Sequence, residues 1–162
     1  SVRVHGKGTF KYDNVRIGMN SRLDTLQAAV LLAKFPVFAE KELDWMQGIA
    51  AKYTEQLKDA VKTPVIKDGF YSSWAQYTIR LSDRAQRDGL QAYLKGQGIP
   101  SAVYYQKPMH RQAAFAGHGY DDGDYPVTNM CSETVLSLPF HPYMTQEEIL
   151  MVCGAVKQYV KG

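Results

Sequence analysis

The segment from Gly18 to Ala29 constrains this chain more than any other, because a polar tip runs there directly into an apolar helical pattern. Ser21 and Asp24 have the spacing of a capping box, which predicts a helix that begins at or next to Ser21. Apolar residues then recur at helical spacing, which predicts that one face of the helix lies against a core. The residues on this face are Leu23, Leu26, Val30 and Ala33.

The start of this predicted helix is rich in hydrogen-bond donors. Its first backbone N–H groups have no partner within the helix, and the helix dipole makes this end positive. Asn20 and Arg22 add side-chain donors at the same place. The segment therefore predicts an anion site for a phosphate or a carboxylate. The alternative is a capped surface helix with a solvated arginine, which the local residues also fit.

Periodicity, capping residues and turn residues predict the remaining elements. Proline lacks an N–H group and disfavours a helical residue before it, so Phe35-Pro36 should separate the first helix from a second that ends near Lys58. Thr145 and Glu148 form a second capping box, which should open the last helix. Between these helices we expect strands at residues 74–81, 99–105 and 135–138, and helices at residues 84–97 and 126–134.

This order of elements predicts an α+β fold. Three short strands interleaved with helices are typical of a small, mainly antiparallel sheet with helices on one face. Two long helices precede this sandwich. Residues 1–19, which are cationic and punctuated by glycines, are expected to form a loop.

Composition argues against several classes of function. The formal net charge is +3 over 162 residues with no long basic run, so nucleic acid is not implied as a partner. No apolar run approaches the ~20 residues that cross a membrane, and no signal peptide opens the chain, so we expect a cytoplasmic protein. Cys131 and Cys153 form no metal motif and are expected to be reduced thiols; no metal site is predicted. The chain starts without Met in mid-pattern, which suggests a fragment.

The segment from Gly18 to Ala29 also resembles a signature of the nucleotide-sugar aminotransferases of the DegT/DnrJ/EryC/StrS type, in its pattern G-x-N-x-R-L-D-x-L-Q-A-A. These are fold-type I enzymes that use pyridoxal 5′-phosphate (PLP). The resemblance covers nearly the whole chain in the expected order, but only the C-terminal part of a family protein. Other matching segments are Arg3-Val4-His5-Gly6, Trp74-x-Gln76-Tyr77, Gly98-Ile99-Pro100, Tyr104-Tyr105, Pro108-x-His110-x-Gln112 and Leu136-Ser137-Leu138-Pro139-x-His141-Pro142.

The resemblance implies roles for individual residues. Asn20 matches the residue that reaches the PLP phosphate of the neighbouring subunit. Arg22 should face the sugar end of the substrate, where relatives acting on uronic acids pair an arginine with the sugar carboxylate. Tyr104, Tyr105 and His110 match the mouth of the active site and could bind substrate oxygens. The structural alternatives are a surface salt bridge for Arg22 and ordinary packing for the other three.

The resemblance implies no catalytic residue within this chain. In the family, the lysine that binds PLP covalently lies upstream of the segment that matches Arg3 to Gly6, and no lysine here sits in that motif. It further implies three regions: an active-site-proximal loop at 1–19, linking helices at 20–60 and a small C-terminal domain at 61–162. The resemblance also implies that an N-terminal PLP-binding domain is missing from this chain, so the 162 residues by themselves are expected to be inactive.

The implied reaction moves an amino group from glutamate to a keto-sugar nucleotide, in a homodimer with shared active sites. The likeness through residues 2–8 and 11–14 is to enzymes that aminate C3 of a UDP-linked 3-keto uronic acid, such as UDP-2-acetamido-3-keto-glucuronic acid, for bacterial surface polysaccharide such as lipopolysaccharide O-antigen. Two alternatives stay open. Some family members carry histidine in place of the lysine and dehydrate sugars, and the chain could also be a non-catalytic binding or dimerisation module.

Overall fold

The computed structural model describes residues 3–10 and 12–162. Val2 and Lys11, which belong to the resemblance to 3-keto uronic acid aminotransferases, lie outside the described residues.

The described residues form two compact units. The first, which we call the loop unit, comprises the described part of Ser1–Ala33 together with Tyr105–Glu133. The second, which we call the core unit, comprises Lys34–Tyr104 together with Thr134–Gly162. Each unit is therefore built from two stretches of chain that are distant in the sequence.

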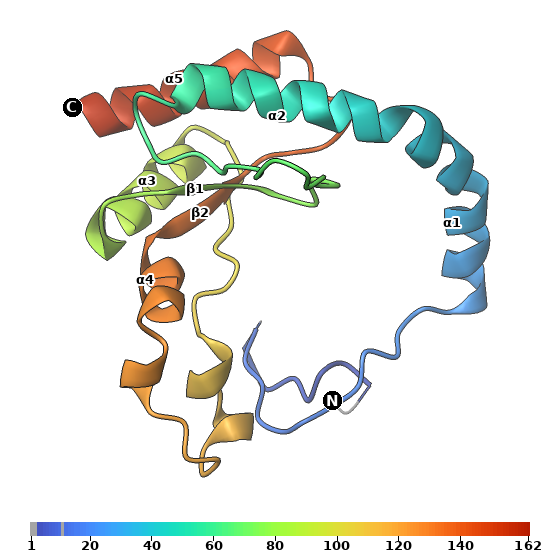
Figure 1. The fold of residues 1–162 in the computed structure, drawn as a ribbon, viewed down its shortest axis with the longest axis vertical. Coiled ribbons are helices and arrows are strands. Elements are labelled where there is room, and N and C mark those ends of the chain that lie inside the picture. Colours follow the sequence, from blue (N-terminus) through green and yellow to red (C-terminus); the bar gives the residue numbers. More distant parts are fainter. Residues whose placement is uncertain (1–2, 11) are drawn as a thin grey trace. The chain divides into compact units, whose positions relative to one another are not determined.

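The core unit holds a two-stranded antiparallel sheet, in which β1 (Tyr77–Arg80) pairs with β2 (Val135–Leu138). Its helices include α2 (Leu43–Leu57), α3 (Arg84–Gly96) and α5 (Gln146–Lys161). Helices α2 and α5 run side by side, and α3 contacts both α5 and β2 (Figure 1). The α+β class and the antiparallel sheet are confirmed.

The core of this unit follows from the periodicity of its elements. In β1, Tyr77 and Ile79 are fully buried, whereas Thr78 and Arg80 are half-buried. This is the alternation that a strand requires. In α5, the buried residues recur every three or four positions. Tyr53 of α2 stacks on Tyr77 with ring centroids 4.9 Å apart, and its hydroxyl donates to the Pro139 carbonyl over 2.9 Å. Aromatic side chains from a helix and a strand thus pack against each other in the core.

Several predicted boundaries are confirmed. Asp83 caps α3 by accepting a hydrogen bond from the Gln86 amide, and α4 spans Pro126–Thr134. The second capping box is present: Thr145 accepts from the Glu148 amide, and the Glu148 carboxylate accepts from the Thr145 amide. Both cysteines are free, and burial raises the pKa of the Cys153 thiol to about 11.

The predicted start of the first helix is wrong. Helix α1 spans Thr25–Val37, because Asp24 is the residue whose carboxylate accepts a hydrogen bond from the Gln27 amide, over 2.8 Å. Ser21 lies outside the helix. Serine and aspartate both cap helices well, and here the residue nearer to the apolar run provides the cap.

The predicted break at Pro36 is also wrong. Pro36 lies inside α1, and the chain passes through a π-helical segment, Phe38–Glu42, directly into α2. Proline removes one hydrogen bond from the helix, and wider π turns often accommodate such defects without ending the helix.

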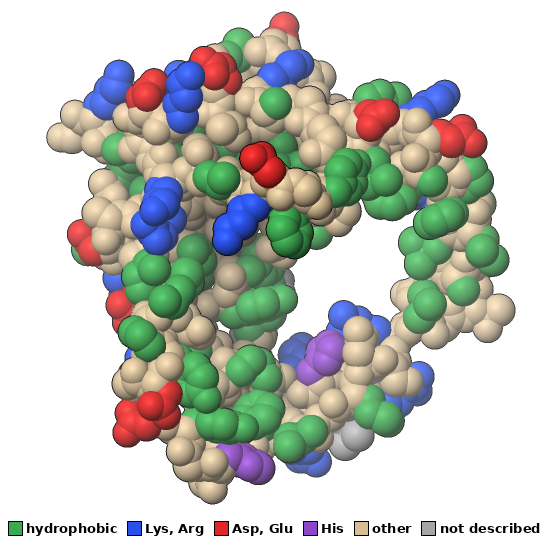
Figure 2. All heavy atoms as spheres, viewed as in Figure 1, with side chains coloured by type: hydrophobic (Ala, Val, Ile, Leu, Met, Phe, Trp, Pro, Cys, Tyr) green, Lys and Arg blue, Asp and Glu red, His purple; other side chains and the backbone are tan. Residues whose placement is uncertain are grey.

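The predicted core face of the first helix is not buried. Leu23, Leu26 and Val30 are 65%, 77% and 61% exposed, and α1 has no buried residue. Figure 2 shows apolar side chains gathered over α1. Leu26, Val30 and Ala33 lie in α1 while Leu23 precedes it, and within the described residues nothing covers this face. No described helix is long and apolar enough to cross a membrane.

Two predicted strands differ from the structure. The strand expected at 74–81 is shorter, because Trp74 has a φ of 50°, which a strand cannot accommodate. The strand expected at 99–105 is reduced to one isolated bridge, between Ala102 and Ser137. Pro100 has no N–H group to donate to a ladder, which limits pairing there. The described sheet therefore has two strands rather than three.

Candidate functional site

The first half of the loop unit is an irregular antiparallel hairpin, which we call the N-terminal hairpin (residues 3–10 and 12–21). Isolated bridges join Val4 to Asn20 and Lys7 to Asn14. Near its open end, the His5 amide donates to the Met19 carbonyl over 3.0 Å. These bonds place Asn20 on a paired backbone, five residues before α1 begins, although its side chain remains exposed.

One glycine makes this hairpin possible. Gly6 has a φ of 71°, in the left-handed region that favours glycine. A Cβ atom at this position would lie 1.7 Å from the carbonyl oxygen of Arg16, on the opposite side of the hairpin. The two backbones can therefore approach this closely only with glycine at position 6.

The start of α1 does not supply the donors that were predicted beside Asn20. Because α1 begins at Thr25, Asn20 and Arg22 precede the helix, so the free N–H groups of its first turn are not placed beside Asn20 by the chain. Instead, Arg22 donates from Nη1 to the Nε2 atom of His5 over 2.8 Å. A guanidinium is always a donor, so His5 accepts with Nε2 and carries its proton on Nδ1.

The polar side chains of the N-terminal hairpin and of the residues directly after it suit an anion. The described cationic groups here are Arg3, Lys7, Arg16 and Arg22, and the exposed amide of Asn20 is one of the neutral donors. Guanidinium and amide donors match phosphate and carboxylate oxygens. Donors of this kind can therefore bind phosphate or carboxylate oxygens.

The second half of the loop unit begins with a turn-rich segment that contains Tyr105 and His110. Tyr105 is 56% exposed and contacts Tyr12 edge-to-face, with ring centroids 5.2 Å apart. Tyr104, its neighbour in sequence, is half-buried and belongs to the core unit. The structure thus places Asn20, Arg22, Tyr105 and His110 in one unit and Tyr104 in the other.

His110 is engaged within the chain. Its side chain is 8% exposed, its Nε2 atom lies 2.9 Å from Oδ1 of Asp122, and its ring stacks on Tyr125 at 4.6 Å between centroids. Arg111 also donates to the Asp122 carboxylate with two nitrogen atoms. The hydrogen bonds from Arg111, and then from His110, hold the pKa of the Asp122 carboxyl well below its usual range. Asp122 therefore ties the acidic loop that follows to the turn containing His110.

Gln112 is the residue whose role the sequence did not reveal. It belongs to the matched pattern Pro108-x-His110-x-Gln112, but its residue type alone assigns it no function. In the structure it is 2% exposed and hydrogen-bonds three backbone groups. Its burial could not be read from the sequence, because short irregular segments have no periodicity that separates inside from outside.

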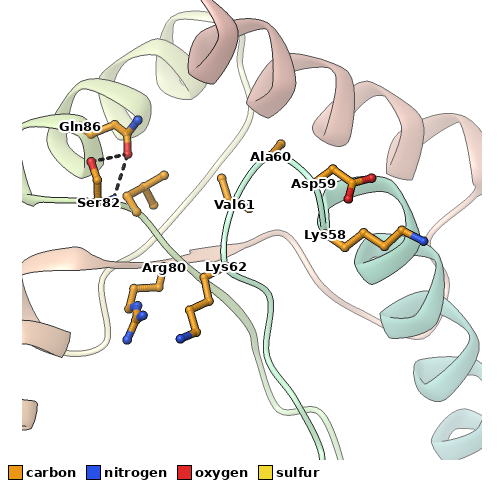
Figure 3. A pocket seen from close by; sticks show the side chains of 9 residues that line it. Lys58, Asp59, Ala60, Val61, Lys62, Arg80, Ser82 and Gln86 are labelled. Carbon is orange, nitrogen blue, oxygen red and sulfur yellow. Dashed lines mark hydrogen bonds between the residues drawn. The ribbon is translucent and has the colours of Figure 1, made fainter.

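A separate cavity lies in the core unit. It has a volume of about 550 Å³, and Figure 3 shows the side chains of Lys62 and Arg80 projecting on the same side of the chain. These two residues face each other across an isolated bridge. The cavity contains none of the candidate site residues. Its lining is Lys58, Asp59, Ala60, Val61, Lys62, Arg80, Leu81, Ser82 and Gln86.

No metal centre competes with the anion site among the described residues. Nowhere in residues 3–10 and 12–162 do three or more histidine, cysteine, aspartate or glutamate side chains gather in a group that could hold a metal ion.

Comparisons with known proteins identify the family. The sequence model of the DegT/DnrJ/EryC1/StrS aminotransferase family matches residues 1–157. The UDP-2-acetamido-2-deoxy-3-oxo-D-glucuronate aminotransferase of Pseudomonas aeruginosa is 40% identical over 156 residues, which are 96% of this chain and 41% of that protein.

Solved structures agree with this match. The crystal structure of a DegT DnrJ EryC1 StrS aminotransferase from Brucella abortus is 44% identical, with a TM-score of 0.78, over 100% of this chain and 42% of that one. S. venezuelae DesV is 29% identical, also with a TM-score of 0.78, over 99% of this chain and 43% of that one. The chain spans about two fifths of the length of each of these relatives. It belongs to the DegT/DnrJ/EryC1/StrS aminotransferase family.

Proposed function

We propose that these residues form the C-terminal part of a PLP-dependent aminotransferase that acts on a keto-sugar nucleotide. The family match supports the class of reaction. The relative from Pseudomonas aeruginosa, which is named for a UDP-linked 3-oxo-glucuronate, supports an acidic sugar as the substrate. Glutamate is the proposed amino donor: it leaves as 2-oxoglutarate, and the ketone of the sugar becomes an amine.

The observation that carries this proposal is the position of Arg22 beside Asn20, at the end of the N-terminal hairpin. Arg22 is exposed and ordered by His5, so its planar guanidinium can pair with the carboxylate of a uronic acid in a forked contact. Asn20 would donate from its amide to the phosphate of PLP. PLP, when bound, supplies the electron sink that amino transfer requires.

We further propose that the active site is shared between two copies of the full-length protein. Asn20 would complete the cofactor site of the partner subunit. The exposed apolar face of α1 supports an assembly in which another surface covers it, since monomeric proteins rarely expose large contiguous apolar patches. In this proposal, residues 1–19 lie near the active site, residues 20–60 link the domains, and residues 61–162 form the small domain of a cytoplasmic enzyme.

The test is an assay of the full-length protein, loaded with PLP, on a UDP-linked 3-keto uronic acid with glutamate. We expect the sugar to gain an amino group while 2-oxoglutarate forms in equal amount. The matched control substrate is a 3-keto sugar nucleotide without the carboxylate, which should react less well because Arg22 then has no partner. Loss of water from the sugar would instead support a dehydratase, and no conversion of either substrate would support a binding module.

A further inference from the structure

The buried side chain of Gln112 joins two parts of the loop unit that are far apart in the sequence. Its Oε1 atom accepts a hydrogen bond from the Asn14 amide over 3.0 Å. Its Nε2 atom donates to the carbonyl of Tyr12 over 3.0 Å and to that of Lys107 over 3.2 Å. The bond to Asn14 spans 98 positions in the sequence. One amide thus binds the tip of the N-terminal hairpin and the turn before His110 simultaneously.

These contacts fit an amide and no other polar group. The carbonyls of Tyr12 and Lys107 need donors, and the amide of Asn14 needs an acceptor. A carboxylate could accept from Asn14 but would face two carbonyl oxygens without a donor. An apolar side chain would leave all three backbone groups without this partner, and unsatisfied buried polar groups are costly.

Neighbouring contacts also join the N-terminal hairpin to residues 105–114. The Ala114 amide donates to the Asn14 carbonyl over 2.9 Å, and the rings of Tyr12 and Tyr105 touch. Lys107 also pairs with Asp13 over 3.2 Å, but both side chains are partly exposed, and such ion pairs contribute little. Gln112 is the buried member of this group, so it has the largest share in fixing the geometry.

We propose that Gln112 is a positioning residue for sugar-nucleotide binding: it locks the tip of the N-terminal hairpin onto the segment that carries Tyr105 and His110. The hairpin contains Asn20 and is followed directly by Arg22, so the lock sets where these donors lie relative to Tyr105. Gln112 itself need not touch the substrate. This inference rests on the function proposed above, because it assigns the hairpin to the substrate site.

The test uses three variants of the full-length protein. Gln112→Glu keeps the shape and the acceptor but removes both donors. Gln112→Met keeps the length without a charge, and carries the test if Gln112→Glu does not fold. The matched control is Gln91→Glu, because the Gln91 side chain makes a single long bond, 3.5 Å, to the Ser101 carbonyl.

The first measurement is hydrogen exchange of backbone amides. Gln112→Met removes the acceptor of the Asn14 amide, and the carboxylate of Gln112→Glu repels the carbonyls of Tyr12 and Lys107, so the two segments should separate in both variants. The amides of Asn14 and Ala114 should then exchange faster by roughly 5- to 100-fold, the range expected when a buried hydrogen bond is lost. The Ala102 amide, which bonds Ser137 in the core unit, should be unchanged. Gln91→Glu should match the wild type at all three amides.

The second measurement separates the two half-reactions. In the Gln112 variants KM for the sugar nucleotide should rise by roughly 5- to 100-fold, while reaction with glutamate stays close to that of the wild type. Unchanged exchange at Asn14 and Ala114 would overturn the proposal. So would faster exchange with an unchanged KM. If the wild type transfers no amino group, the proposed function fails and with it the substrate role of Gln112, whereas the exchange data still decide whether Gln112 locks the hairpin.

Discussion

Arg22 donates a hydrogen bond from Nη1 to the Nε2 atom of His5 over 2.8 Å, so the guanidinium is held by a residue on the opposite side of the N-terminal hairpin. His5 is itself fixed, because its φ is 56° and its amide donates to the carbonyl of Met19. In the proposed function, this contact orients Arg22 before the substrate arrives. Such preorganisation reduces the entropy lost when a ligand binds.

Arg22→Ala in the full-length protein should weaken use of the sugar nucleotide more than reaction with glutamate. The loss of a charged hydrogen bond to the sugar carboxylate should cost ~1.5–3 kcal/mol in kcat/KM for the sugar nucleotide. Separate single-turnover measurements of the two half-reactions check this. Equal losses in both would show that Arg22 serves folding or cofactor binding.

A mixed dimer should recover activity from two inactive full-length variants. One variant lacks the lysine that binds PLP, and the other carries Asn20→Asp, which sets a carboxylate against the cofactor phosphate. If Asn20 serves the partner subunit, subunit exchange yields one site in which both residues are intact, and activity returns in part. If a mass measurement verifies that the subunits have exchanged and no activity returns, Asn20 acts within its own subunit or only in the hairpin.

Asp122→Asn should weaken the dependence of stability on acid. Arg111 and His110 lower the pKa of this carboxyl in the folded protein, so its contribution is present above about pH 4, the usual value for an unfolded aspartate. It is lost as the pH falls further towards the folded pKa. Thermal unfolding between pH 7 and pH 2 should therefore show a smaller drop in Tm for Asp122→Asn than for the wild type. Asp124→Asn, in the same loop, is the control and should follow the wild type.

Two glycine-to-alanine changes should act in opposite directions. Gly6→Ala forces a Cβ atom onto the Arg16 carbonyl at a left-handed φ, so the N-terminal hairpin should open and sugar-nucleotide binding should fall.

Gly48 lies in α2 with nothing within 4 Å of a Cβ atom, so Gly48→Ala should raise the free energy of unfolding by about 0.5–1 kcal/mol. Denaturant titration and binding assays check both. A destabilised Gly48→Ala would show that α2 is closely covered at this position.

Elements with strong local signals were predictable from the sequence. Pro126 opens α4 and the Thr145–Glu148 capping box opens α5, because the physics of a helix start lies within four residues. The start of α1 was not predictable, since Ser21 and Asp24 are both good caps and only the folded chain chooses between them. The strand at 99–105 failed for a related reason. β-pairing depends on a partner strand, and the sequence does not say where Ala102 finds one.

The sequence singled out candidate site residues by type, and their binding roles stay predictions; their contacts within the chain come from the structure. Asn20 and Arg22 were singled out by sequence, yet the partner of Arg22 is His5, which lies 17 positions away. His110 was expected at the mouth of a site, and the structure engages it with Asp122 and Tyr125 instead of leaving it open. The role of Gln112 could be found only from the structure, because no sequence pattern marks a buried amide in a segment without regular structure.

The order in which the chain passes through the two units has a consequence for the order of folding. The hydrogen bond between Asn14 and Gln112 closes a loop of 98 positions, and most of that loop is the core unit. Closing a long flexible loop costs entropy that grows with its length. Once Lys34–Tyr104 has collapsed with its partner segment, much of that loop is already compact, so the remaining closure is short. The hairpin that presents Asn20 should therefore dock late during refolding, and it should be the first part of the chain to detach when the protein begins to unfold.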